Sequence, residues 1–141
     1  MKGSTINYLV DAGPLIGLLD ADDQWHEWSR RTFALLDGPL AITETPLAEV
    51  CHRLRRLRPA LLEILRLLAE GQLRLIPALG DQPGRVGELI AKYPQMDVAD
   101  ATLVVLSEQI PAARLITLDN DFRHYRRHRH QAIPVVMPRP D

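Results

Sequence analysis

Short, almost uninterrupted apolar segments alternate along this chain with stretches whose apolar residues recur at helical spacing. Strands that are apolar on both sides are typical of parallel sheets with helices on both faces. The pattern therefore predicts an α/β fold, a three-layer α/β/α sandwich around a central, mostly parallel sheet of about five strands. The expected strands are residues 5–10, 40–43, 73–76, 114–118 and 133–137.

Helices are expected between these strands, and several have recognisable starts. Asp22 or Asp23 is a candidate N-cap for a helix over 24–36, and Thr45 followed by Pro46 favours a helix start at that point. Asp97 is expected to open a later helix. The other expected helices are 14–19, a segment from 45 that stops before 59, 59–70 and 86–93.

Composition limits the class of protein. With 141 residues, 46% of them apolar, the chain is long enough for one domain with its own core, residues 1–141. A net charge of -1 argues against a uniformly basic nucleic-acid-coating protein, although local basic patches remain compatible with it. Cys51 is the single cysteine, so neither an intrachain disulfide nor a cysteine-based zinc site is expected. No segment approaches the length of a membrane span and no signal peptide is visible, so we expect a cytoplasmic protein.

Acidic residues fall close to the carboxyl ends of the predicted strands or in the first turn of a helix. Because these strand ends share one edge of a parallel sheet, distant acids can meet there. Clustered carboxylates repel one another unless a cation is bound, and oxygen-only donors suit Mg²⁺ or Mn²⁺. The candidate ligands are Asp11, Glu49, Asp97, Asp100 and Asp119.

Each acid also has a purely structural interpretation. Glu49 is four residues from Arg53 and can form a surface ion pair with it. Asp97 can act only as a helix cap, and Asp119 can belong to an ordinary turn. The site hypothesis depends on the acids acting together.

Four segments make the chain similar to the PIN-domain ribonucleases, which include the toxins of VapBC-type toxin–antitoxin pairs. These segments are LVDAGPLIGLLD from Leu9, TPLAEVCHRL from Thr45, MDVADATLVVLSE from Met96 and LITLDNDF from Leu115. The resemblance implies an α/β/α sandwich with an acidic Mg²⁺ or Mn²⁺ site. The catalytic acids that it implies are Asp11, Glu49, Asp100 and Asp119, with Asp97 as a further ligand or a cap.

One position departs from the family pattern. The family often has Ser or Thr directly after the first aspartate, whereas this chain has Ala12 and Gly13. Thr117 or Thr43 is expected to replace the missing hydroxyl beside the site. Asp121 matches a position that is often acidic in the family, and we expect a structural role for it.

Two basic clusters flank the acidic segments, one on the helix after residue 45 and one after Asp119. Cations beside an acidic metal site would hold an RNA backbone against it. Tyr125, within the second cluster, is a candidate to stack on an unpaired base. The alternative is a solvated helix face and surface segment. The candidate RNA contacts are Arg53, Arg56, Arg123, Arg126 and Arg127.

These features predict a Mg²⁺- or Mn²⁺-dependent endoribonuclease that hydrolyses RNA phosphodiester bonds. The resemblance also implies a homodimer and an antitoxin protein as partners, with no membrane. Two alternatives remain: a PIN-like module of weak activity that binds RNA or protein, and a small Mg²⁺-dependent phosphatase or receiver-type protein. The second lacks its usual sequence neighbours, since no DxD motif begins at Asp11.

Overall fold

The computed structural model describes residues 5–139 and contains one five-stranded sheet. All four strand pairings are parallel, in the order β3-β2-β1-β4-β5. The predicted α/β fold is therefore confirmed. Residues 1–4 and 140–141 of the expected domain lie outside the described residues. The strands are β1 (Tyr8–Val10), β2 (Leu40–Ile42), β3 (Leu73–Leu75), β4 (Arg114–Ile116) and β5 (Val135–Val136).

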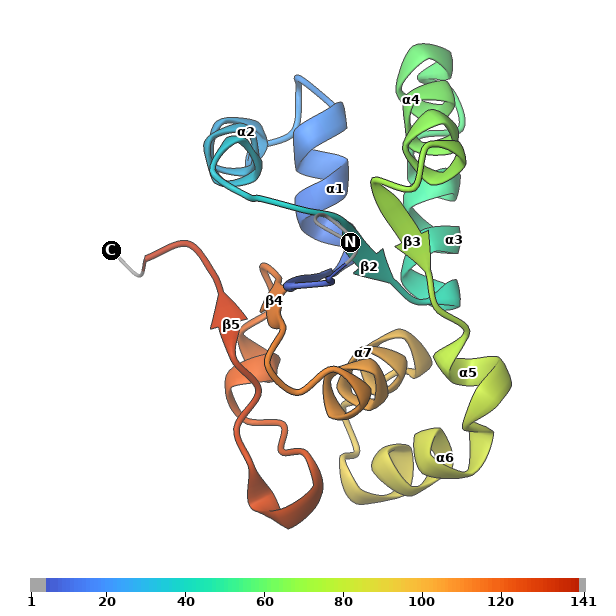
Figure 1. Cartoon of the computed structure of the whole chain (residues 1–141), viewed down its shortest axis with the longest axis vertical. Helices are drawn as coiled ribbons and strands as arrows, with labels where there is room; N and C mark the ends of the chain where they lie inside the picture. Colours follow the sequence, from blue (N-terminus) through green and yellow to red (C-terminus); the bar gives the residue numbers. More distant parts are fainter. Residues whose placement is uncertain (1–4, 140–141) are drawn as a thin grey trace.

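Helices cover the sheet on both sides, which gives the three expected layers (Figure 1). One layer holds α1 (Ala12–Leu19), α2 (His26–Ala34), α3 (Glu44–Arg53) and α4 (Arg58–Ala69). The other layer holds α5 (Ala78–Asp81), α6 (Pro83–Lys92) and α7 (Val98–Gln109). Two 3₁₀ helices follow β4, and these are η1 (Asn120–Arg123) and η2 (His128–His130).

Neighbouring residues of the central strands point to opposite layers, as the pleat of a strand requires. Leu9 and Leu115 belong to the core cluster beneath α7, whereas Val10 and Ile116 belong to the cluster beneath α1 and α3. Both kinds of position are fully buried. The uninterrupted apolar strands in the sequence follow from this two-sided burial.

The structure corrects two predicted helix starts. The N-cap of α3 is Thr43, not Thr45. Pro46 lies in the first turn, where backbone amides have no acceptor within the helix, so the missing N–H of proline costs no hydrogen bond there. Neither Asp22 nor Asp23 caps α2, because Trp25 is its N-cap and Asp23 instead accepts a hydrogen bond from the Trp25 amide at 2.8 Å.

Other differences concern the lengths of elements. The strands are shorter than expected, and the short helix α5 was not predicted. Among residues 5–139, no helix is long and apolar enough to cross a membrane.

Candidate functional site

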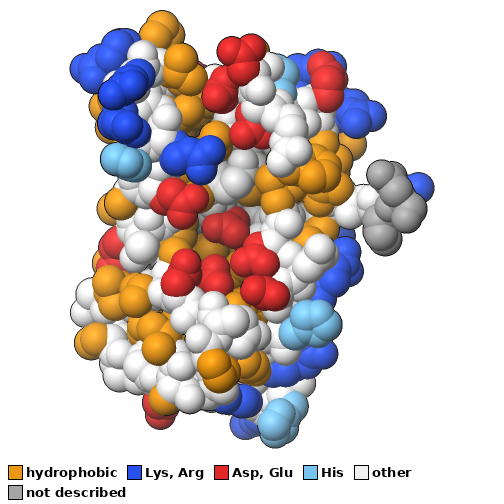
Figure 2. Space-filling view, turned by 180° about the vertical axis from the view of Figure 1, so that it is seen from behind, with side chains coloured by type: hydrophobic (Ala, Val, Ile, Leu, Met, Phe, Trp, Pro, Cys, Tyr) orange, Lys and Arg blue, Asp and Glu red, His pale blue; other side chains and the backbone are white. Residues whose placement is uncertain are grey.

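The five predicted acidic ligands line one pocket of about 310 Å³ at the carboxyl edge of the sheet. The parallel pairing of β1 with β4 places the residues that follow these two strands side by side. Contacts between α3 and α7 bring the acids of those helices to the same place. Figure 2 shows Asp and Glu side chains gathered at the centre of this face. The pocket is lined by Asp11, Gly13, Glu49, Asp97, Ala99, Asp100, Leu118 and Asp119.

Asp11 follows β1 and is also the N-cap of α1. Its Oδ1 accepts a hydrogen bond from the Ala12 amide at 2.7 Å, and its Oδ2 accepts one from the Thr117 hydroxyl at 2.9 Å. Burial raises the pKa of Asp11 to about 6 despite these two hydrogen bonds, and the charges of Asp119 and Glu49 add to the increase. The carboxylate is thus fixed in position while its negative charge is disfavoured.

Asp97 and Asp100 share the first turn of α7. Asp97 caps the helix, because its Oδ1 accepts a hydrogen bond from the Asp100 amide at 2.8 Å. The side chain also lines the pocket, so the cap and the site use the same residue. Burial, followed by the charge of Asp97, raises the pKa of Asp100 to about 7, while a hydrogen bond from Tyr125 opposes the shift.

The Thr117 hydroxyl links two acids across the sheet edge. It donates to Asp11 Oδ2 at 2.9 Å and accepts from the Asp119 amide at 3.0 Å. This places a hydroxyl against Asp11, which Ala12 cannot supply. Asp119 Oδ1 in turn accepts from the Asp121 amide at 2.9 Å and caps η1.

Thr43, the other predicted hydroxyl, lies elsewhere. It is fully buried, and its hydroxyl is 2.8 Å from that of Thr102. No hydrogen bond joins it to a pocket acid among the described residues, so the structure gives it a place in the core between α3 and α7.

Glu49 is the acid with the greatest freedom. It is exposed on α3 and forms no hydrogen bond or ion pair with any residue of 5–139. The predicted surface pair with Arg53 is therefore not formed, and the helix leaves both the carboxylate and the guanidinium open to a ligand.

The donor set fits a hard divalent cation. All five candidate ligands are carboxylates, and burial, with a further contribution from the neighbouring negative charges, raises the pKa values of Asp11 and Asp100. Within residues 5–139, however, no three Asp, Glu, His or Cys side chains already have the arrangement that would hold a metal ion. A cation would have to draw these side chains together.

The sequence comparison identifies the family. The PIN domain model matches residues 8–128. This range contains all four segments that carry the resemblance. The chain belongs to the PIN-domain family. No curated protein matches it in sequence.

Three solved structures share the fold of this PIN domain. Mycobacterium tuberculosis VapC20, a toxin that cleaves the sarcin–ricin loop, aligns with a TM-score of 0.72 and 17% identity over 83% of this chain and 92% of that chain. A toxin–antitoxin complex from Klebsiella pneumoniae has a TM-score of 0.64 and 20% identity over 82% and 89%. Rickettsia felis VapBC2, bound to promoter DNA, has a TM-score of 0.66 and 15% identity over 96% and 100%. The predicted resemblance to VapC-type PIN domains is confirmed at the level of family and fold.

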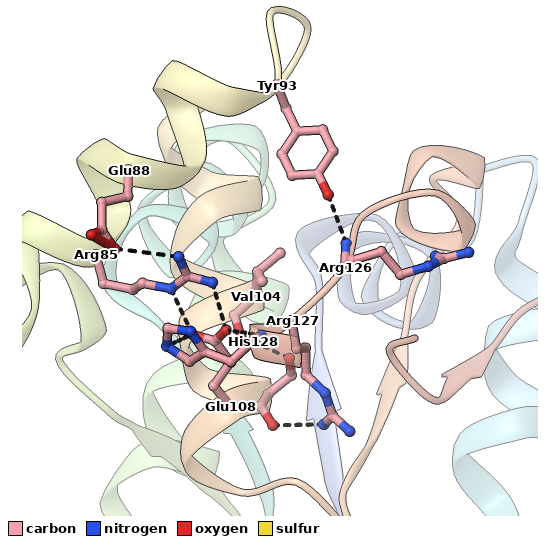
Figure 3. Close-up of polar contacts among 9 residues, drawn as sticks. Arg85, Glu88, Tyr93, Val104, Glu108, Arg126, Arg127 and His128 are labelled. Carbon is pink, nitrogen blue, oxygen red and sulfur yellow. Dashed lines mark hydrogen bonds and ion pairs between the residues drawn. The ribbon is translucent and has the colours of Figure 1, made fainter. Parts of the chain in front are cut away.

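Two of the predicted RNA-binding arginines donate hydrogen bonds within this PIN domain, and Figure 3 draws the contacts of the Arg127 guanidinium and of the Arg126 amide, which donates to the Tyr93 hydroxyl at 3.1 Å. Arg127 is 9% exposed, and its guanidinium donates to the carbonyls of Ser107 at 2.8 Å and Pro111 at 3.0 Å. The prediction that Arg127 contacts RNA is therefore wrong, because its side chain is buried and connects the segment after β4 to the end of α7. The guanidinium of Arg126 donates to the carbonyls of Arg123 and Tyr125.

The remaining three predicted arginines are open to solvent. Arg53, Arg56 and Arg123 are exposed, and their guanidinium groups have no hydrogen bond or ion pair to a residue of the described chain. They keep the capacity to meet phosphate.

Tyr125 is not a base-stacking residue. Its ring is fully buried and packs edge-on against Tyr93 and Phe122, with ring centroids 5.1 and 5.3 Å away. Its hydroxyl donates to Asp100 Oδ2 at 3.1 Å, a contact that sequence reasoning missed because the two residues are far apart in the chain. Burial and the Asp100 charge raise the pKa of the phenol, so it remains a donor.

Proposed function

We propose that this PIN domain is a metal-dependent endoribonuclease that acts as the toxin of a toxin–antitoxin pair. The observation that carries the proposal is the pocket in which five carboxylates from β1, α3, α7 and the segment after β4 converge. Such a concentration of negative charge is unfavourable without a cation, and a bound divalent cation can activate water for phosphodiester hydrolysis.

Asp11, Glu49, Asp100 and Asp119 would hold Mg²⁺ or Mn²⁺, with Asp97 as a further ligand. The ion would supply an activated water and neutralise the charge that grows on the phosphate oxygens. One of these carboxylates would also accept the proton of the attacking water. Hydrolysis in this manner leaves a 5′-phosphate and a 3′-hydroxyl, and no Ser or His nucleophile is needed.

Exposed arginines would bring the RNA backbone to this pocket. Arg53 is one helical turn from Glu49 on α3, so its guanidinium lies on the side of the helix that carries the acid. Arg56 follows α3 and is exposed as well, and Arg123 ends the 3₁₀ helix that Asp119 caps. Phosphate contacts of this kind position RNA without reading its sequence.

The proposed partners follow from the structural neighbours. The Klebsiella pneumoniae neighbour is a toxin–antitoxin complex, and the Rickettsia felis neighbour is a VapBC assembly. We propose that an antitoxin occupies the acidic pocket of this chain and that two copies of the chain form a homodimer.

RNA cleavage in the presence of Mn²⁺ or Mg²⁺ tests the proposal. The wild-type protein should cleave RNA, and chelation or Asp11→Asn should abolish the cleavage. Asp37→Asn is the matched control, because Asp37 is an exposed aspartate that precedes β2 and so lies toward the opposite edge of the sheet. Cleavage that survives both chelation and Asp11→Asn would show that the pocket is not the active site.

A second candidate function is a PIN-like module that binds RNA or protein without cutting. The observation that favours it is that no three acids are preassembled as ligands within residues 5–139. Calorimetric titration with Mn²⁺ separates the two candidates. A nuclease should bind the ion in a manner that depends on Asp11 and Asp119, whereas a module without activity should show no carboxylate-dependent binding.

A further inference from the structure

A second cavity lies directly beside the acidic pocket, and Leu118 lines both. It has a volume of about 280 Å³. Its lining combines apolar side chains with an amide and two guanidinium groups, whereas every charged residue that lines the neighbouring pocket is an acid. Its walls include Trp25, Leu118 and Met137 on the apolar side and Asn120, Arg123 and Arg139 on the polar side.

Residues that line the cavity follow directly in the sequence on a residue of the acidic pocket. Asn120 directly follows Asp119, and Arg123 ends the 3₁₀ turn that Asp119 caps. Because η1 is short and the amide of its second residue, Asp121, donates to the Asp119 carboxylate, the two sites stay close together. In Figure 2 hydrophobic side chains gather beside the acidic cluster, and Lys and Arg side chains follow along the same edge of the molecule.

Trp25 offers an exposed aromatic ring from a rigid backbone. The ring residue is 36% exposed. Its amide donates to Asp23 Oδ1 at 2.8 Å, and its carbonyl accepts from the Ser29 amide at 2.9 Å. The turn is packed so closely against α1 that a Cβ at Gly17 would lie 3.2 Å from the Trp25 carbonyl oxygen. Because the backbone of Trp25 is already fixed, stacking of its ring on a flat group would cost only the freedom of the side chain.

The polar groups of the cavity are open for a ligand. Asn120, Arg123 and Arg139 are exposed, and their side chains make no hydrogen bond or ion pair with residues 5–139. Two guanidinium groups match a phosphodiester, and an amide matches the edge of a base. The volume of about 280 Å³ lies just below the usual range of ligand cavities, about 300–1,000 Å³, and so suits a single base.

We infer that this cavity is a nucleotide subsite, which binds one unpaired RNA base on Trp25 and its phosphate between Arg123 and Arg139, next to the phosphate that is cut. Asn120 contacts the base edge and contributes base preference. The inference rests on the proposed ribonuclease function, since it names the neighbour of the scissile phosphate. A chain with the acidic pocket alone would cleave any accessible phosphodiester.

Tryptophan fluorescence tests the subsite without relying on cleavage. The chain has two tryptophans, so Trp28→Phe leaves Trp25 as the only one. Asp11→Asn is added to prevent hydrolysis, and single-stranded RNA octamers of A, C, G or U are titrated in Mg²⁺ buffer. Circular dichroism confirms that the variant is folded. We expect RNA to quench Trp25, with a different affinity for each base.

Substitutions then assign the groups. Arg123→Ala should weaken RNA binding about tenfold, and Asn120→Ala should reduce the difference between the bases. Arg114→Ala is the matched control, because Arg114 is an exposed arginine at the start of β4, toward the other edge of the sheet. It should leave both the quenching and the affinity unchanged.

The outcomes separate the subsite from the enzyme. RNA that binds by anisotropy without quenching Trp25, or that binds equally well to Arg123→Ala, would overturn the subsite and leave the nuclease intact. Quenching by RNA in a protein that never cleaves with Mn²⁺ would support the subsite and overturn the nuclease. A chain that shows neither RNA binding nor cleavage would overturn both.

Discussion

The hydroxyl of Tyr125 donates a 3.1 Å hydrogen bond to Asp100 Oδ2 from a ring that is fully buried. Contacts with Tyr93 and Phe122 fix the ring, so the hydroxyl has one position. The hydrogen bond favours the ionised form of Asp100, whereas burial and the charge of Asp97 raise its pKa. Tyr125 thus orients one oxygen of Asp100 and leaves Oδ1 without a hydrogen bond from a described residue.

Tyr125→Phe should therefore weaken metal binding more than folding. We expect the Mn²⁺ affinity to fall about tenfold, as when an outer partner of a ligand is removed, and the free energy of unfolding to fall by about 1 kcal/mol. Calorimetry and urea unfolding measure the two quantities. Tyr8→Phe is the control, because its hydroxyl makes no hydrogen bond with a described residue. Equal metal affinity in the two variants would contradict the orienting role.

The pH dependence of stability should reveal the crowded carboxylates. Asp11 and Asp100 have pKa values of about 6 and 7 in the folded chain, above the ordinary 3.8, so the folded state binds more protons than the unfolded state between these values. Their contribution to stability is present below about pH 4 and is lost as the pH rises through 6 and 7. The metal-free protein should lose on the order of 2 kcal/mol of its free energy of unfolding between about pH 5 and pH 8.

Urea unfolding at several pH values measures this loss, and a double variant supplies the comparison. Asp11→Asn with Asp100→Asn removes both titrating groups, so its stability should change little over the same range. Mn²⁺ should raise the stability of the wild-type protein more at pH 8 than at pH 5, because protons compete with the ion at low pH. A wild-type stability that rises steadily over this range would contradict the inferred pKa shifts.

Two threonine hydroxyls allow a test of what holds the acids in place. Thr117→Val removes the hydroxyl that contacts Asp11 Oδ2 and the Asp119 amide, so RNA cleavage should fall about tenfold or more. Thr43→Val removes a hydroxyl whose hydrogen-bond partner among residues 5–139 is the Thr102 hydroxyl, so it should cost about 1 kcal/mol of stability and leave cleavage per folded molecule unchanged. Thr117→Ser should restore activity. Comparable cleavage by the two valine variants would argue against the role of Thr117.

The alternation of apolar strands with helices was sufficient to predict the sheet, since each strand residue contacts one of two cores. The position of Asp11 directly after β1 was predictable for the same reason, because the end of a central parallel strand lies at the edge where loops converge. The two interpretations of Asp97, a helix cap or a residue of the acidic site, are compatible, because Asp97 both caps α7 and lines the pocket.

The errors concern groups whose surroundings come from distant parts of the chain. Local spacing favours Thr45 as a cap as much as Thr43, and only the end of β2 at Ile42 decides between them. Burial of Tyr125 depends on Tyr93, which lies far earlier in the chain, as well as on the nearby Phe122. Arg127 looks like its neighbours in the sequence, and its burial appears only when the chain after β4 packs against α7.

The arginines predicted together as RNA contacts should therefore separate into two groups. Arg127→Met should lower the free energy of unfolding by about 2–3 kcal/mol, because it leaves the carbonyls of Ser107 and Pro111 without their charged donor. Arg53→Ala and Arg56→Ala should leave stability within about 0.5 kcal/mol, because both side chains are exposed and make no contact of this kind with described residues. Each should instead weaken RNA binding and reduce the salt dependence of the binding constant by about one counter-ion. Thermal unfolding and RNA binding at several salt concentrations measure both effects. If Arg127→Met kept full stability while its RNA affinity fell with a reduced salt dependence, Arg127 would be a phosphate contact after all and its buried position in the fold would be wrong.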